Sequence, residues 1–285
     1  MYAVTGVTGK VGGSVARLLL EAGLPVRAVM RDAAKGAPLA DLGAEIAVAS
    51  SDDAAAMSAA FAGTDGVFLM NPPNFDPQPD FADTQRNAAA FVQAIETAKP
   101  GKVVLLSTVG VHVQEFNLLN NMRIVETALR SVSTPLAFLR AGWFMENASW
   151  DVDASRSGVV RSFLQPLDHA IPMVATADVA ATVAGLLRET WSGLRIVELE
   201  GPRRCSANDI ARGFAAALGH PVRNEVVPRA SWESLFRAQG MHNPLPRMRM
   251  IDGFNEGWIN FEGGAAEHRH GSTSLDEVLK QLVAG

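Results

Sequence analysis

Short hydrophobic runs alternate with longer amphipathic segments through the first half of the chain. The runs predict strands at residues 2–5, 26–30, 44–49, 66–70, 102–107 and 135–139. Between the first two runs, apolar side chains recur at helical spacing at Val11, Val15, Leu18 and Leu19. Gly23 follows this segment, where a helix C-cap is expected. Strands that alternate with helices predict right-handed βαβ units and a parallel sheet buried on both faces.

The second half of the chain is less regular. In the first half, residues 53–62 also predict an Ala-rich helix. In the second half, a helix over 178–187 and a strand over 195–199 are expected to return to the sheet. We therefore predict an α/β protein, a Rossmann doubly wound parallel sheet with a smaller, discontinuous α+β substrate lobe. The expected boundaries are residues 1–150 and 175–200 for the domain that contains the sheet and residues 151–174 and 201–285 for the lobe.

Two local signals mark elements of this lobe. The pattern at 206–209 resembles a capping box and opens a helix over 210–218. Pro244 and Pro246 indicate a loop before the next structured segment, at 248–258. The lobe is expected to cover the carboxyl ends of the strands.

Composition narrows the class of protein. Of the 285 residues, 48% are hydrophobic and 19% are charged, which supports a large core and argues against disorder. The net charge of -5 offers no basic surface to nucleic acid or to an anionic membrane, and the apolar runs are shorter than the ~18 residues of a membrane span. Cys205 is the only cysteine, which fits a reducing compartment, and the first motif begins at Thr5 without room for a signal peptide. We expect a cytoplasmic protein whose oligomeric state is open.

Glycines recur at three-residue intervals between the first predicted strand and helix. Gly6 permits a tight turn, Gly9 lets the backbone approach a pyrophosphate at the positive end of the helix, and Gly12 allows close packing of helix and strand. The alternative is a glycine-rich surface turn, but here the strand, the glycines, the helix and a second strand occur in the required order. The predicted dinucleotide-binding loop comprises Gly6, Thr8, Gly9, Lys10, Val11 and Gly12.

The end of the second strand indicates which dinucleotide binds. An NAD site usually places a carboxylate there to hold the ribose 2′-hydroxyl, whereas an arginine pairs with a 2′-phosphate. Arg31 and Lys35 therefore favour NADP(H). NAD(H) is the alternative if Arg31 is only solvated and Asp32 caps the next helix. Asp52 follows the third strand, where its side chain either contacts adenine or serves as a helix N-cap.

Polar residues also follow the fourth and fifth strands. Asn71 and Pro72 come after the fourth strand, and Ser107 and Thr108 come at the end of the fifth. Open parallel sheets bind ligands at these carboxyl ends. We therefore assign all four to the cofactor site, although turn-forming polar residues are also typical there.

Six segments spread over nearly the whole chain resemble one known family. They are Val4-Thr5-Gly6-Val7-Thr8-Gly9, Val26-Arg27-Ala28-Val29-Met30-Arg31-Asp32, Val103-Val104-Leu105-Leu106-Ser107, Leu139-Arg140-Ala141-Gly142-Trp143-Phe144-Met145-Glu146-Asn147, Asp178-Val179-Ala180 and Gly271-Ser272-Thr273-Ser274-Leu275. The combination resembles the NmrA-like branch of the atypical short-chain dehydrogenases. Its Leu-Arg-Ala-Gly-Trp-Phe segment is fairly specific to that branch, whereas the glycine motif alone is not. The resemblance implies that Gly142, Trp143 and Phe144 form the nicotinamide end of the cleft.

The proton relay of ordinary short-chain dehydrogenases is missing. Those enzymes use a tyrosine as general acid/base and a lysine four residues later that lowers the pKa of the tyrosine. When the family's Lys-x-x-x-Glu spacing ends at Glu126, the lysine position is Met122 and the tyrosine position is Leu118. The neighbouring register gives Leu119 and Arg123 instead. The only tyrosine of the chain lies in the first predicted strand.

This loss favours some acceptors over others. Hydride transfer to a ketone produces an alkoxide nearly as basic as hydroxide (water pKa ~16), whereas a quinone gives a phenolate-like anion (pKa ~10) that water can protonate. The family resemblance implies NAD(P)H:quinone oxidoreductases, azoreductases or NADP-sensing regulators without turnover. We therefore expect an NAD(P)H-dependent oxidoreductase acting on a quinone or similar small conjugated acceptor. The alternative is a non-catalytic NADP(H) sensor that acts through a regulatory protein partner, and the methionine at position 122 disfavours an epimerase or an isoflavone-type ether reductase.

The remaining candidates carry weaker signals. His112 lies just beyond the fifth strand and is the best-placed titratable group to replace the tyrosine, although most lone histidines are not catalytic. No other residue is assigned a catalytic role. Glu267, His268 and His270 lack further ligand spacing, so we expect a solvated loop and no metal site. An apolar wall for a flat acceptor, or ordinary packing of the lobe, is expected from Trp150, Phe163, Phe254 and Trp258.

Overall fold

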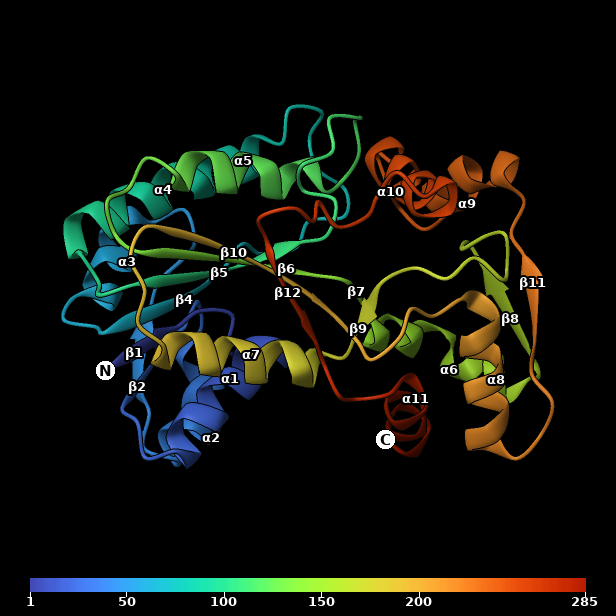
Figure 1. Cartoon of the computed structure of the whole chain (residues 1–285), viewed down its shortest axis with the longest axis horizontal. Helices are drawn as coiled ribbons and strands as arrows, with labels where there is room; N and C mark the ends of the chain where they lie inside the picture. Colours follow the sequence, from blue (N-terminus) through green and yellow to red (C-terminus); the bar gives the residue numbers. More distant parts are fainter.

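A parallel sheet of eight strands forms the centre of the protein, seen in a computed structural model that describes residues 1–285 (Figure 1). The strands are β1 (Tyr2–Val4), β2 (Val26–Met30), β3 (Glu45–Val48), β4 (Gly66–Met70), β5 (Val103–Thr108), β6 (Leu136–Ala141), β10 (Leu194–Glu200) and β12 (Glu267–His270). Their order across the sheet is β12-β10-β6-β5-β4-β1-β2-β3, and every neighbouring pair is parallel. The predicted α/β class and parallel sheet are confirmed.

Helices cover both faces of this sheet (Figure 1). One face carries α1 (Lys10–Glu21), α2 (Ala37–Ala40) and α7 (Thr176–Arg188), and the other carries α3 (Ala54–Phe61), α4 (Ala82–Ala98) and α5 (Asn120–Leu129). In β4, Phe68 packs into the core under α1 and α7, whereas Val67 and Leu69 pack into the core under α3, α4 and α5. A strand buried on both faces needs apolar residues at every position, which explains the continuous hydrophobic runs. No helix is long and apolar enough to cross a membrane.

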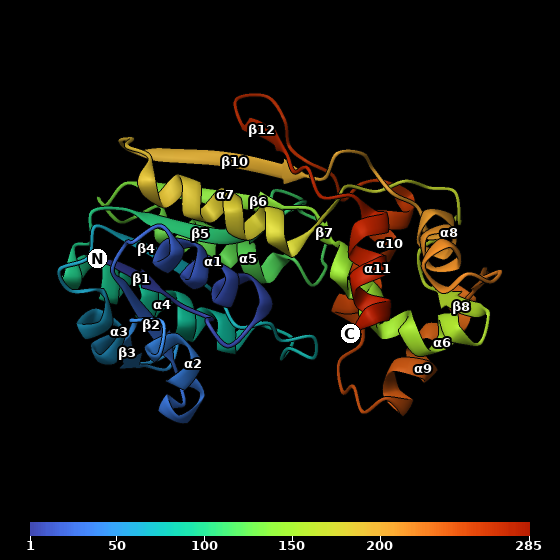
Figure 2. The same cartoon turned by 90° about the horizontal axis from the view of Figure 1, so that it is seen from below.

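The rest of the chain forms a smaller lobe beside the carboxyl ends of the central strands (Figures 1 and 2). It contains two short parallel pairs, β7 with β9 and β8 with β11. Its core is built around Phe214, Trp232, Phe236, Phe254 and Leu279. The elements outside the eight-stranded sheet and its covering helices are β7 (Trp143–Phe144), the 3-10 helix η2 (Met145–Asp151), α6 (Val152–Arg156), β8 (Val159–Ser162), β9 (Met173–Val174), α8 (Ala207–Leu218), β11 (Arg223–Val226), η3 (Arg229–Ser231), α9 (Trp232–Ala238), α10 (Leu245–Glu256) and α11 (Leu275–Ala284).

The last part of the chain is tied back to the sheet. Asp178, in the first turn of α7, accepts hydrogen bonds from the backbone N and the Oγ1 of Thr273, both at 2.9 Å. A Cβ on Gly271 would lie 2.3 Å from Asp178 Oδ2, so glycine is required for this approach. Two segments of the family resemblance, nearly a hundred positions apart, therefore meet in one structural contact.

Several local predictions are confirmed. β2 and β4 have the predicted limits. The capping box is formed: Ser206 Oγ accepts from Asp209 N at 3.2 Å, and Asp209 Oδ2 accepts from Ser206 N at 2.7 Å. α8 begins earlier than predicted because residues 207–209 form its first turn.

Two expectations are wrong. Pro246 does not belong to a loop but to the first turn of α10, which begins at Leu245, because the first N–H groups of a helix have no partner within the helix and a proline there loses nothing. Residues 267–270 do not form a solvated loop but the edge strand β12. The sequence Glu-His-Arg-His has no hydrophobic alternation, and an edge strand held by backbone pairing does not require one.

Candidate cofactor and acceptor site

The loop between β1 and α1 turns through closely packed glycines. Gly6 has a φ of +65°, a left-handed conformation that other residues rarely adopt. A Cβ on Gly12 would lie 2.4 Å from Gly6 O and 2.6 Å from Thr5 O. Gly13, which the sequence analysis missed, is restricted in the same way, since its Cβ would lie 2.9 Å from Val7 O. This geometry agrees with the turn and packing roles predicted for the first and third glycines of the motif.

Gly9 begins α1 and leaves its amino end open. Its backbone is extended (φ -98°, ψ 173°), no side chain caps the helix, and the first turn contains no acidic residue. The N–H groups of Lys10, Val11 and Gly12 donate to no acceptor within the protein. A Cβ on Gly9 would meet only Gly6 O, at 3.4 Å. Unpaired N–H groups, the positive end of a helix dipole and room for close approach fit a dinucleotide pyrophosphate.

A cleft of about 340 Å³ opens beside this helix end. Its walls come from the glycine loop, the ends of β4 and β5, β7, η2 and the first turn of α7. The predicted cofactor residues that line it are Gly6, Gly9, Lys10, Val11, Gly12 and Phe144. The sequence analysis did not assign its other walls, chiefly Met70, Pro73, Leu106, Glu146 and Thr176.

Glu146 fixes one wall of the cleft. Its carboxylate accepts hydrogen bonds from Thr176 N at 2.9 and 3.0 Å and from Thr176 Oγ1 at 2.5 Å. The N-cap position of α7, Ala175, has no polar side chain, so Glu146 caps this helix from a distant segment. The only sequence signal for Glu146 was its place in the segment that resembles the family.

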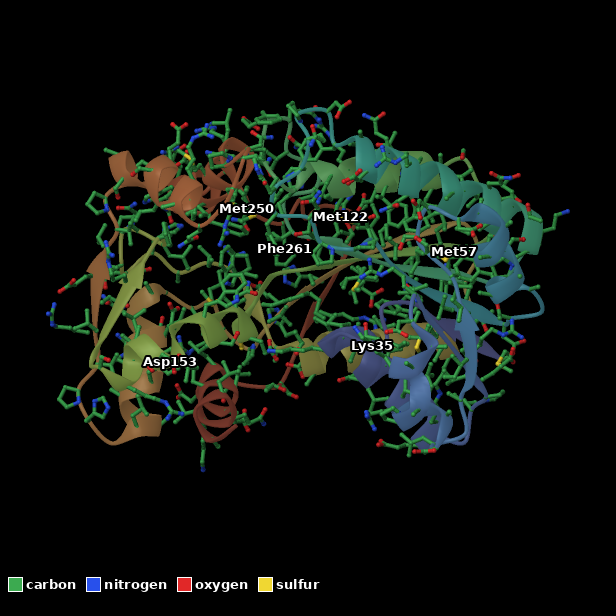
Figure 3. The ribbon with its side chains drawn as sticks, turned by 180° about the vertical axis from the view of Figure 1, so that it is seen from behind. Lys35, Met57, Met122, Asp153, Met250 and Phe261 are labelled. Atoms are coloured by element: carbon green, nitrogen blue, oxygen red, sulfur yellow. The ribbon has the colours of Figure 1, made fainter.

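The charged residues after β2 lie at the surface, and Asp32 caps the next helix, as the alternative interpretation expected. Arg31 and Lys35 are exposed and form no ion pair within the protein, and Figure 3 shows Lys35 on the side of the N-terminal elements that faces the lobe. Asp32 accepts a hydrogen bond from Ala34 N at 3.0 Å and caps the 3-10 helix η1 (Ala33–Gly36). Its carboxylate is therefore engaged locally, while both cations remain free for a phosphate. Their contact with the cofactor stays a prediction.

Asp52 is not a helix cap. The N-cap of α3 is the next residue, Asp53, which accepts from Ala56 N at 3.0 Å. Asp52 instead accepts a hydrogen bond from Ser50 Oγ, and this bond lowers the pKa of the Asp52 carboxyl. Its predicted contact with adenine stays a prediction.

Behind the cleft, side chains from three elements converge on one buried ion pair. Arg140 in β6 donates from Nε and Nη2 to the two carboxylate oxygens of Glu126 in α5, at 3.1 and 2.9 Å. Ser107 Oγ in β5 donates to Glu126 Oε1 at 2.6 Å, and Arg140 Nη1 donates to Glu262 at 2.5 Å. Burial opposes the charge of Arg140, but the hydrogen bonds and charges of Glu126 and Glu262 together outweigh it and raise the pKa of Arg140. The Ser107 hydroxyl therefore donates its proton to Glu126, and its contact with a cofactor stays a prediction.

Other residues at the strand ends also have partners within the protein. Asn71 is buried, and its Oδ1 accepts from Asn87 Nδ2 at 2.9 Å. Thr108 Oγ1 donates to the next carbonyl along the chain at 3.2 Å. Gly142 packs closely on the segment before β9, where its Cβ would lie 2.8 Å from Pro172 O. Their contacts with a cofactor stay predictions.

Only one of the four aromatic residues proposed as an acceptor wall lines the cleft, and it is Trp150. Phe163, Phe254 and Trp258 pack in the core of the lobe, as the alternative interpretation had it. Trp143 meets Phe254 edge to face, with ring centroids 5.2 Å apart. The apolar end of the cleft is therefore smaller than the sequence suggested.

The positions of the usual proton relay hold no proton donor for the cleft. Leu118 is buried in the lobe core, and Met122 packs against the core under α4 and α5 (Figure 3). Arg123 donates to Val113 O at 3.1 Å and to Gln114 Oε1 at 2.8 Å, so it holds the loop before α5. The absence of a tyrosine–lysine relay, inferred from the sequence, holds in three dimensions.

His112 lies half-buried in the same loop. Its Nδ1 is buried without a hydrogen-bond partner, and its side chain does not line the cleft. A role for His112 as proton donor stays a prediction.

Glu267, His268 and His270, at the edge of the sheet, do not converge on one point. Glu267 accepts from Arg195 Nη2 at 2.7 Å, whereas His268 Nε2 pairs with Glu200 at 2.9 Å. Glu200, His268 and His270 each place one potential ligand atom within 4.8 Å of the others. The Glu200 carboxylate is already satisfied by His268 and by Arg204 Nε at 3.1 Å.

Comparisons with known proteins agree with this geometry. The chain is 27% identical over 252 residues to an NAD(P)H azoreductase from Xenophilus azovorans, covering 86% of this chain and 83% of that protein. It is 31% identical over 226 residues to a (4-alkanoyl-5-oxo-2,5-dihydrofuran-3-yl)methyl phosphate reductase from Streptomyces griseus, covering 79% and 76%. The structure of an NADPH-dependent quinone oxidoreductase from Escherichia coli, complexed with NADPH, superposes with a TM-score of 0.81 at 22% identity, covering 99% of each chain.

Both relatives are named as reductases, and the name of the azoreductase includes NAD(P)H. The family model described as "NmrA-like family" matches residues 2–258, which is most of the sheet and of the lobe. The chain belongs to the NmrA-like family.

Proposed function

We propose that this protein is an NADPH-dependent oxidoreductase that reduces a quinone or a similar small conjugated acceptor. The observation that carries the proposal is the cleft itself. It joins the open amino end of α1 to an apolar wall that includes Phe144 and Trp150, while Leu118 and Met122 occupy the positions of the usual proton relay.

The residues of the glycine loop would bind the dinucleotide. The free N–H groups of Lys10, Val11 and Gly12 are directed at the place of the pyrophosphate, and the absence of a side chain on Gly9 leaves room for it. When bound, the reduced dinucleotide supplies a hydride. Arg31 and Lys35, both free of ion pairs, would select the 2′-phosphate and so favour NADPH over NADH.

The remaining walls would position the acceptor and exclude water. Leu106 and Phe144 give the cleft an apolar end, and the bonds of Glu146 to Thr176 hold that end rigid. Positioning contributes most of the rate in such a site. The anion formed from a quinone (pKa ~10) takes its proton from water, so no protein acid is needed, whereas the alkoxide formed from a ketone would require one.

The names of the two relatives support a conjugated acceptor, since one is an azoreductase and the other reduces an oxo-dihydrofuran phosphate. We propose that residues 1–150 and 175–200 form the cofactor-binding domain and that residues 151–174 and 201–285 form the lobe beside the acceptor, although the acceptor walls Leu106, Phe144 and Trp150 come from the first group. The strand β12 is the exception, because it lies in the second group but completes the sheet.

Anaerobic mixing of the purified protein with NADPH and a panel of quinones tests the proposal directly. The absorbance of the reduced nicotinamide should fall with quinones and should change little with unactivated ketones or aldehydes of similar size. Efficient turnover of an unactivated ketone would contradict the mechanism. Tight NADPH binding without turnover of any acceptor would instead assign the protein to the NADP(H) sensors, whose target is a regulatory protein.

A further inference from the structure

An arginine surrounded by aromatic rings lies at the rim of the cleft. The guanidinium carbon of Arg247 lies 4.7 Å from the ring centroid of Phe236 and 5.7 Å from those of Phe75 and Trp150. Phe75 and Trp150 meet edge to face, with centroids 6.3 Å apart. We call these four residues the aromatic–arginine cluster. Trp150 also lines the cofactor cleft, so the cluster and the cleft are continuous.

Arg247 has no acidic partner. It is partly buried, it forms no ion pair, and none of its N–H groups donates to an acceptor within the protein. Burial alone lowers the pKa of Arg247, with no opposing contribution from a carboxylate. By contrast, Arg229 and Arg249 of the same lobe share the carboxylate of Asp252. None of the guanidinium nitrogens is a fully buried atom without a partner, so the five N–H donors of Arg247 face water and are available to an anionic ligand.

Asp76, the carboxylate that follows Phe75 in the sequence, is engaged elsewhere. It accepts hydrogen bonds from the backbone N of His242 at 2.9 Å and of Asn243 at 2.6 Å, and it pairs with His242 Nδ1 at 2.9 Å. The backbone bonds in particular lower the pKa of Asp76, so this carboxylate stays charged and bound. They fasten the loop after β4 to the loop before α10, which holds Phe75 beside Arg247 without neutralising the arginine.

The two outer rings of the cluster face solvent. Phe75 is 44% exposed and Trp150 is 63% exposed, whereas Phe236 is fully buried beneath the arginine. Two exposed rings beside an unpaired cation match a ligand that is both flat and anionic, because the rings offer stacking and the guanidinium offers charge-assisted hydrogen bonds.

We propose that the aromatic–arginine cluster is an acceptor subsite for planar aromatic compounds with an acidic substituent. The ring of the acceptor packs against Trp150 and Phe75, and a carboxylate, sulfonate or phosphate group pairs with Arg247. This inference rests on the proposed function, because Trp150 connects the cluster to the cleft in which the acceptor would be reduced.

Steady-state kinetics with a matched pair of acceptors tests the subsite. The values of kcat/KM are measured for 1,4-naphthoquinone-2-sulfonate and for 1,4-naphthoquinone, and their ratio is compared between proteins. In Arg247→Gln the ratio should fall by about tenfold, the effect of losing one charge-assisted contact at a partly exposed site. The control is Arg161→Gln, which removes an exposed arginine of β8 and should leave the ratio unchanged. If Arg247→Gln leaves the ratio unchanged, whether kcat/KM stays the same or falls equally for both acceptors, the proposal is overturned.

A binding experiment separates this inference from the proposed function. Naphthalene-2-sulfonate, which accepts no hydride, is titrated calorimetrically into the protein saturated with NADP⁺. Arg247→Gln should weaken its binding by about tenfold, and Arg247→Lys, which keeps the charge, should retain part of the affinity. Failure of all quinones to react would remove the reductase function while this loss of affinity would still support the subsite. No binding to the wild-type protein, or equal binding to wild type and Arg247→Gln, refutes the subsite even if quinones are reduced.

Discussion

The two sides of the cleft are built differently. On the cofactor side, one continuous segment from Gly6 to Gly12 offers its backbone, and its side chains mainly leave room. On the acceptor side, Phe75, Trp150 and Arg247 come from the loop after β4, from η2 and from α10, and they offer side chains.

This difference explains why the cofactor side could be predicted from the sequence and the acceptor side could not. Recognition by the backbone requires residues of a particular size at fixed spacing, so its signature survives as a motif. Recognition by side chains gathered from distant segments leaves no spacing to read. A family can therefore keep one cofactor and one fold while its acceptors change.

The largest expected effect is a loss of dinucleotide affinity after a substitution in the glycine loop. Gly9→Val should weaken dinucleotide binding by at least about 100-fold, because a branched side chain fills the space of the pyrophosphate. The protein should still fold, since the extended backbone of Gly9 suits valine and its Cβ meets only Gly6 O, at 3.4 Å. Calorimetric titration with NADPH measures the loss. The control is Gly185→Val in α7, where a Cβ meets nothing within 4 Å, and its affinity for NADPH should be unchanged.

The second prediction, with a smaller expected effect, concerns the Arg31 side chain, which would recognise the cofactor's 2′-phosphate. Arg31→Ala should weaken NADPH binding by about 1.5–3 kcal/mol, the range for a charge-assisted contact, and should leave NADH binding nearly unchanged. Dissociation constants for both dinucleotides check this. If the wild-type protein binds the two equally, Arg31 is only a surface residue and the preference for NADP is lost.

A substitution at Asp151 tests how a buried charge next to Trp150 affects the stability of the protein, and this test needs no ligand. It follows Trp150, accepts no hydrogen bond, and burial raises its pKa to about 6 from 3.8. A carboxyl with a raised folded-state pKa destabilises the protein as the pH rises above the unfolded value, and the cost is complete above about pH 6. Asp151→Asn should therefore raise the free energy of unfolding by about 1–2 kcal/mol at about pH 8, and by much less at about pH 4. Urea unfolding at both pH values decides, and equal stabilisation at both would rule out the charge as the cause.

The smallest expected effect concerns the missing proton donor. His112→Ala should change the rate of quinone reduction by no more than about threefold, because water protonates the product anion. The pH profile of kcat should also be unchanged. A loss of ~100-fold, the scale of a general acid, would show that His112 has replaced the tyrosine of ordinary short-chain dehydrogenases.

Local sequence signals located most of the nucleotide-binding half. The limits of β2 and β4 and the glycine turn were predicted in that half, and the capping box at Ser206 was predicted in the lobe, because each depends on neighbours within a few residues. Two segments were assigned wrongly, at Pro246 and in β12. Both segments are held by partners that are remote in sequence: Pro246 O accepts from Leu118 N at 2.9 Å, and β12 pairs with β10.

The sequence by itself determined the α/β class, the family, the turn of the glycine loop and the absence of a tyrosine–lysine relay, since each depends on residue identity at short spacing. Only the tertiary structure decided how these residues are used. It joined Ser107 and Arg140 to Glu126, excluded Phe254 from the cleft, and set Glu146 to cap α7. It also left Arg247 without a carboxylate, because whether a charge is paired depends on which distant loops the fold brings beside it.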